Sequence, residues 1–122
     1  MVTERQRQMI QELQEKTVQG KLAWTRAQAD PPAFLTCLPS GLNFLIVDVG
    51  SSRGLISSAS GDKWALTMSD ASGAPLLRLT TRGLDEGDPL DRLLSDLFEA
   101  ARNAADEVRQ AEETALNDLK AL

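Results

Sequence analysis

The spacing of apolar residues predicts a helix at the start of the chain, over residues 1–20. Residues with apolar groups recur there at helical spacing, while glutamine and glutamate fill the positions between them. This face consists of Met9, Ile10, Leu13 and Thr17. Thr3 and Gln6 have the spacing of a capping box, and Gly20 suits the left-handed backbone that often ends a helix.

The middle of the chain, residues 33–82, consists of short apolar or alternating runs separated by turn signals. These runs predict strands at 33–38, 42–49, 64–69 and 76–81. Residues 70–73 have the composition of a tight hairpin turn with glycine in the left-handed position. Short connections favour a four-stranded antiparallel meander. The preceding residues, 21–32, are interpreted as a short extended segment that ends at the two prolines.

A second helix is predicted over residues 88–122, with Asp88 as its cap and Pro89 at its first position. No glycine or proline follows Pro89. Apolar residues form one stripe whose steps alternate between four and three residues up to Ala115 and continue to Leu119 after one extra four-residue step. This pattern is typical of a helix packed on a nearly straight partner. The stripe contains Leu90, Leu94, Leu97, Ala101, Ala104, Val108, Ala111, Ala115, Leu119 and Leu122.

This predicted helix is longer than the sheet requires. At 1.5 Å per residue it spans roughly 50 Å, whereas strands of about six residues reach only about 20 Å. Bulky residues occupy its first half, and the stripe then turns to alanine. Residues 104–122 are therefore expected to pack on another helix, either the first helix or one from another chain. The predicted interaction residues are Ala101, Ala104, Val108, Ala111, Ala115, Leu119 and Leu122.

Together these elements predict one α+β domain over residues 1–122. It consists of a helix at 1–20, a four-stranded antiparallel β-meander at 33–82, and a long helix at 88–122 packed on one sheet face. A length of 122 residues with 42% hydrophobic and 25% charged residues is typical of a single globular domain.

The residue inventory argues against catalysis. The chain has no histidine, no tyrosine and one cysteine, which excludes histidine-based triads and zinc ribbons. We therefore predict no catalytic residues, no metal site, no cofactor and no enzyme activity. Trp24 and Trp64 are expected in the core, and Cys37 is expected to be a small buried apolar residue.

Charge and hydropathy restrict the partners. Residues 84–122 carry four basic and eleven acidic side chains, so binding to a nucleic-acid backbone is not expected. No apolar run approaches the roughly 20 residues of a membrane helix, and no membrane partner is expected. The polar N-terminal residues have no apolar run of the kind found in secretory leaders and the cysteine is single, so a cytoplasmic location is expected.

One short motif, "VDVGSSRG", resembles the first motif of class I methyltransferases and the Asp-x-Gly-Ser loop of actin-like sugar kinases. In the methyltransferase pattern the matching positions are Asp48, Gly50, Ser52 and Gly54, with Ser52 in place of the usual glycine. The resemblance implies a loop that binds a nucleotide or nucleoside cofactor, and the candidate loop residues are Asp48, Gly50, Ser51, Ser52, Arg53 and Gly54. Such a loop normally leads into a helix whose amino end faces the ligand. Here "LISSASGDKW" follows, so a hairpin loop of small residues is favoured.

A longer resemblance covers most of the chain. Residues 15–24, "EKTVQGKLAW", and residues 97–102, "LFEAAR", are similar to segments of a group of small uncharacterised bacterial proteins. Those proteins share a Glu-Lys-Thr-x-x-Gly-Lys-Leu/Ile-x-Trp stretch, a β-meander and a Leu-Phe-Glu-x-Ala-Arg helix. The resemblance implies an α-β-β-β-β-α order and brings no activity.

The sequence thus favours a non-catalytic interaction module that forms a homodimer or is a small subunit of a larger bacterial complex through its last helix. Two alternatives stay open. One is a small-ligand sensor or enzyme that uses the loop at 48–62. The other is capture of a peptide strand at an edge of the sheet.

Overall fold

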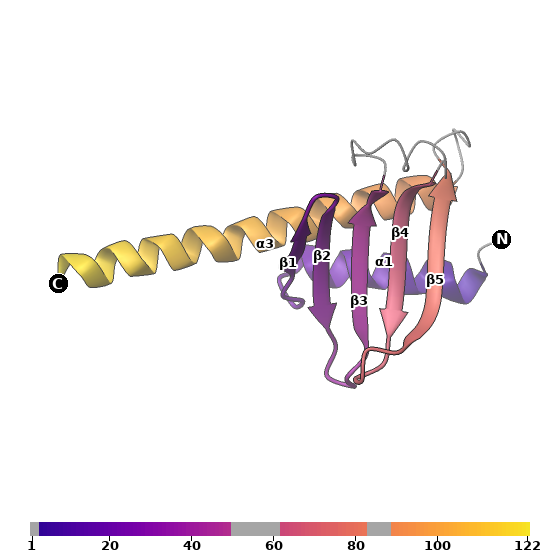
Figure 1. The fold of residues 1–122 in the computed structure, drawn as a ribbon, viewed down its shortest axis with the longest axis horizontal. Coiled ribbons are helices and arrows are strands. Elements are labelled where there is room, and N and C mark those ends of the chain that lie inside the picture. Colours follow the sequence, from indigo (N-terminus) through magenta and orange to yellow (C-terminus); the bar gives the residue numbers. More distant parts are fainter. Residues whose placement is uncertain (1–2, 50–61, 83–88) are drawn as a thin grey trace.

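The chain folds as two helices around one antiparallel sheet, as Figure 1 shows. The computed structural model describes residues 3–49, 62–82 and 89–122. The elements in this part are α1 (Glu4–Val18), β1 (Thr25–Ala29), β2 (Pro32–Cys37), β3 (Asn43–Asp48), β4 (Asp62–Ser69), β5 (Pro75–Arg82) and α3 (Pro89–Ala121). The predicted α+β class, the first helix, the antiparallel meander and the long last helix are confirmed. The predicted cap Asp88 lies outside the described residues.

Both ends of α1 are set by the residues that the sequence indicated. The Thr3 hydroxyl accepts a hydrogen bond from the Gln6 amide at 3.1 Å, and the Gln6 side-chain oxygen accepts one from the Thr3 amide at 3.1 Å. The pair forms a complete capping box. Gly20 has φ of +77°, a backbone angle that residues with a Cβ rarely adopt, and the chain leaves the helix there.

The sheet has the order β1-β2-β3-β4-β5, and each strand pairs antiparallel with the next. Phe34 in β2 lies opposite Ile46 in β3, and Ile46 lies opposite Leu66 in β4. Because cross-strand partners share a face, these side chains project to the same side of the sheet. All three are buried, so this row forms the floor of the core.

The prediction of four strands is wrong, because the segment at 21–32 contains a fifth. Residues 25–29 form β1, whose Thr25 lies opposite Leu35 and whose Ala29 lies opposite Pro32. All five residues of β1 are exposed, so their sequence shows no alternation between buried and exposed positions. The backbone ladder to β2 defines this edge strand, and Asp30 and Pro31 connect the two strands in a short hairpin.

Both helices pack on one face of the sheet (Figure 1). They lie side by side and run in the same direction, with α1 along the first part of α3. One core cluster fills the space between the layers, with Ile10 and Leu13 from α1, and Leu94 and Leu97 from α3. It also contains Trp24 and Trp64, at 1% and 7% exposure, which confirms their prediction as core residues. The core therefore lies under the first half of α3.

Cys37 is exposed, so its prediction as a buried residue is wrong. It is the last residue of β2, directly after the buried Thr36. Successive side chains of a strand point to opposite faces, and Thr36 takes the inward position, where its hydroxyl donates to the Ala23 carbonyl at 2.8 Å. Cys37 therefore points away from the helices.

The predicted hairpin turn at 70–73 is confirmed, and Asp70 holds it together. One carboxylate oxygen of Asp70 accepts hydrogen bonds from the Ser72 hydroxyl at 2.6 Å, the Ser72 amide at 2.9 Å and the Ala74 amide at 3.0 Å. The hydrogen bond from the Ser72 hydroxyl is the largest cause that lowers the pKa of Asp70 below its ordinary value. The backbone hydrogen bonds to the same carboxylate lower this pKa further. Gly73 takes the left-handed position, with φ of +91°.

This turn predicts a pH dependence of stability. A lowered carboxylate pKa stabilises the fold above the pKa of the unfolded chain, and that stabilisation is lost as the pH falls through the folded pKa. Wild type is therefore expected to unfold at a higher temperature than Asp70→Asn at pH about 7 and to lose this advantage below pH about 4, near the ordinary aspartate pKa. Thermal unfolding followed by circular dichroism measures both proteins. A difference that stays constant with pH would contradict the role of Asp70.

Candidate functional site

The first half of α3 is fixed to the sheet. Leu90, Leu94, Leu97, Phe98 and Ala101 are buried, and the Phe98 ring contacts two core aromatic rings. Its centroid lies 5.4 Å from that of Phe34 and 5.0 Å from that of Trp64. Polar contacts anchor the first turn, where Asp91 meets the Thr81 hydroxyl at 3.3 Å and the Lys63 ammonium at 3.7 Å.

The second half of α3 leaves the sheet. Beyond the half-buried Asp106, every residue up to Leu122 is exposed, and the helix extends well past β1 in Figure 1. We call residues 107–122 the distal segment. Its large apolar side chains are exposed to fractions of 44% for Val108, 52% for Leu116, 66% for Leu119 and 98% for Leu122. The expectation that the helix outruns the sheet is confirmed.

The predicted interaction stripe divides at the point where α3 leaves the sheet. Ala101 belongs to the core at 0% exposure, so it is not available to another chain, because the stripe faces the sheet there. Ala104 is partly buried against the core. The remaining members, Val108, Ala111, Ala115, Leu119 and Leu122, lie on the exposed distal segment.

The first helix does not cover these exposed residues. It ends at Val18, and its last residues lie across a hollow from Ala104 and Val108. The sequence left two packing partners open for the end of α3, namely α1 and a helix of another chain. In the structure, α1 packs on the proximal part of α3. Leu116 is an additional exposed apolar residue that the predicted stripe does not include. Leu116 precedes Leu119 by three residues and Lys120 by four, and side chains at these spacings are neighbours on a helix surface. This spacing is the feature of the sequence that could have identified Leu116.

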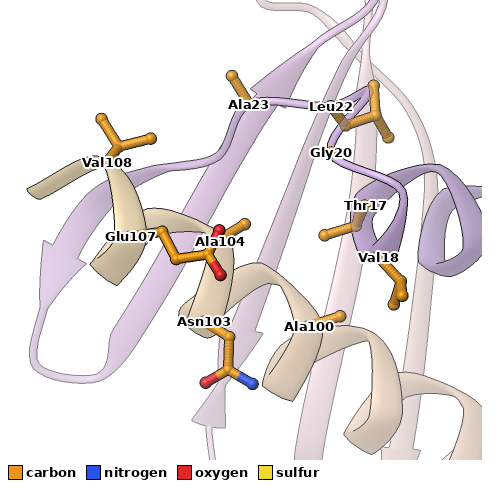
Figure 2. A pocket seen from close by; sticks show the side chains of 10 residues that line it. All are labelled: Thr17, Val18, Gly20, Leu22, Ala23, Ala100, Asn103, Ala104, Glu107 and Val108. Atoms are coloured by element: carbon orange, nitrogen blue, oxygen red, sulfur yellow. The ribbon is translucent and has the colours of Figure 1, made fainter. Parts of the chain in front are cut away.

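Two hollows flank Val108 at the base of the distal segment. The first, which we call the α1 hollow, has a volume of about 350 Å³ and lies between the end of α1, the following turn and α3 (Figure 2). Its walls are mostly apolar, with Val18 and Leu22 on one side and Ala104 and Val108 on the other. Glu107 is its one charged lining residue.

The second hollow, which we call the β1 hollow, has a volume of about 200 Å³ and lies under the edge strand. It is lined by Trp24, Thr25, Arg26, Phe34, Ala105, Asp106, Val108, Arg109 and Glu112. Val108 therefore stands on a ridge between two depressions.

The charges beside the stripe are mainly acidic. Residues 104–122 contain five acidic and two basic side chains. Arg109 is 3.7 Å from Glu113 on the exposed side, which neutralises part of this charge locally. Glu107 and Glu112 are exposed and, within the described residues, form no ion pair. The apolar stripe is thus flanked by the carboxylates of Glu107 and Glu112, and Glu112 shares the β1 hollow with Arg26 and Arg109.

Among the six residues of the alternative ligand loop, the structure describes only Asp48. Asp48 ends β3, half-buried and opposite Trp64, and it takes part in an interaction there. The other predicted loop residues, Gly50, Ser51, Ser52, Arg53 and Gly54, lie outside the described residues. The sheet edges needed for strand capture are β1 and β5.

Residues 3–49, 62–82 and 89–122 contain no group of three or more metal-ligating side chains. Across the same part of the chain, no helix combines the length and apolar character that membrane crossing requires.

Comparison with known proteins assigns no family and no function to this chain. Searches of protein-family models, curated proteins and solved structures gave no match for this chain. The resemblance to small bacterial proteins therefore stays a prediction.

Proposed function

We propose that this protein is a non-catalytic interaction module that binds a helix of another polypeptide through the distal segment of α3. The observation that carries this proposal is the exposure of Val108, Leu116, Leu119 and Leu122 on a helix that has left its own sheet. Several large apolar side chains exposed along one helix favour a site of protein association, because large exposed apolar surfaces commonly mark such sites.

The length of α3 supports the same conclusion. Five strands about 4.8 Å apart are covered by a helix of about 20 Å, whereas 33 residues extend about 50 Å. The sheet and α1 therefore account for about half of the helix. An isolated helix of about 15 residues is only marginally stable in water, and amphipathic helices gain most of their stability from packing. A partner on the distal segment supplies that packing.

The small residues define how a partner approaches. Ala111 and Ala115 lie between larger residues on the same side of α3. With only a methyl group at these positions, a second helix backbone comes close, while side chains from that helix enter the two hollows beside Val108. The gain comes from removing apolar surface from water, about 25 cal/mol per Å², less the cost of ordering both partners.

Site-specific photocrosslinking in cells that produce the protein natively tests this proposal. A benzophenone side chain replaces Leu116 in one variant and Gln110, on the opposite side of α3, in the control. We expect a discrete protein adduct from position 116 and none from position 110. Adding Val108→Glu to the Leu116 variant should remove the adduct, because a carboxylate then stands in the middle of the apolar surface.

The change at Val108 has a matched control. Val108 is 44% exposed, so Val108→Glu is expected to change the free energy of unfolding by less than about 1 kcal/mol. Gln110→Glu adds the same charge outside the stripe and should leave the adduct unchanged. No adduct at position 116, or equal adducts at 116 and 110, would sink the proposal.

A further inference from the structure

The occupant of the distal segment is constrained by charge. Glu107 and Glu112 stand on either side of the stripe line that passes through Val108, and both are exposed. Side chains at such flanking positions face their counterparts on a partner helix and decide which partner is accepted. A helix that packs here therefore meets two carboxylates as well as an apolar surface.

A second copy of this chain fits these flanks poorly. In a parallel pair in register, a residue on one flank faces the residue five positions later on the other helix, which sets Glu107 against Glu112 of the second copy. In an antiparallel pair centred between Ala111 and Ala115, Glu112 faces Glu112 of the second copy. Both arrangements bury the whole stripe and place like charges together, which opposes association. The net charge of −5 on each chain adds to this repulsion.

The α1 hollow carries negative charge, whereas two acidic and two basic side chains line the β1 hollow. The lining of the α1 hollow contains one acidic side chain, Glu107, and no basic one. The carboxyl end of α1 borders the hollow, and the carbonyl end of a helix carries partial negative charge. Figure 2 shows Glu107 and Ala104 on the α3 wall, with Thr17 and Val18 on the α1 side. An apolar side chain with a neighbouring cation suits this place.

We propose that the natural occupant is an amphipathic helix of a different protein whose apolar stripe is flanked by lysine or arginine. This inference rests on the proposed function and specifies the partner chemistry. The apolar residues of that helix cover Val108 and the residues beyond it, and its cations pair with Glu107 and Glu112. Opposite charges on such flanks raise the association rate and the selectivity, because a helix with like charges there is disfavoured.

Two synthetic helical peptides test the inference on the full chain. They share one leucine and alanine stripe and differ only at the flanking positions, which are all lysine in the first and all glutamate in the second. Fluorescence anisotropy is expected to show binding of the lysine peptide at least about tenfold tighter than binding of the glutamate peptide at about 50 mM salt, with the difference reduced at about 300 mM.

Charge reversal in the protein separates specific pairing from general attraction. Glu107→Lys with Glu112→Lys should reverse the peptide preference. Glu99→Lys with Glu113→Lys changes the net charge equally at residues that line neither hollow, and should keep the preference for lysine. Equal binding of both peptides, or equal effects of the two double variants, overturns the inference.

Light scattering on the purified wild type distinguishes failure of the basic-partner inference from failure of the proposed function. A monomer is expected. A dimer that Val108→Glu dissociates would show that a second copy occupies the surface, which overturns the basic partner and leaves the interaction module in place. A monomer that binds neither peptide overturns the basic partner, and absence of the photocrosslinked adduct as well removes the interaction module.

Discussion

Leu97→Ala is expected to lower the free energy of unfolding by about 2–5 kcal/mol, the range for a buried leucine replaced in a close-packed core. Leu97 is 0% exposed and lies in the cluster beneath α3. The substitution removes apolar contacts and leaves a cavity that the surrounding residues fill only partly. Urea unfolding followed by circular dichroism gives the value.

Leu116→Ala is the matched control, because it makes the same change in the same helix. Leu116 is 52% exposed on the distal segment, so the expected change in free energy of unfolding is within about 0.5 kcal/mol for the monomer. A similar loss from both substitutions would show that the distal segment packs on its own domain. The contrast also means that substitutions on the distal segment report on association with little effect on folding.

Thr17→Val is expected to destabilise the fold by about 1–3 kcal/mol, the cost of leaving a buried polar group without its hydrogen bond. The Thr17 hydroxyl accepts from the Trp24 indole N–H at 2.8 Å and donates to the Leu13 carbonyl at 2.6 Å. Both Thr17 and Trp24 are buried. Valine has nearly the shape of threonine, so the substitution removes the acceptor and leaves the indole N–H unpaired.

Thr17→Ser keeps the hydroxyl and is the control for this bond. It removes one methyl group, worth about 0.8 kcal/mol when fully buried. Urea unfolding of the three proteins under one condition should rank wild type first, Thr17→Ser second and Thr17→Val last. If Thr17→Ser is as destabilised as Thr17→Val, the methyl contacts stabilise this position and the hydrogen bond does not.

Local rules explain which elements were predictable. The ends of α1 depend on Thr3, Gln6 and Gly20, all within or next to the helix, and the turn before β5 depends on Asp70 and Gly73. Each of these features is stabilised by neighbours a few residues away. The sequence was therefore sufficient to predict them.

Non-local pairing explains the errors. Strand β1 exists because its backbone pairs with β2, and its exposed residues show no alternation. Cys37 is exposed because Thr36 takes the inward position and binds the Ala23 carbonyl. Ala101 belongs to the core because the sheet still covers α3 at that point. In each case a contact with another segment decided the outcome.

The sequence by itself determined the α+β class, both helices, the meander and the excess length of α3, because hydrophobic periodicity and helix rise are local properties of the chain. Only the tertiary structure decided where the stripe changes from core to surface, at residues 104–108, and created the two hollows beside Val108. The reason is physical. Hydrophobic periodicity shows which residues share a face of a helix or strand, whereas burial depends on which distant segment packs against that face.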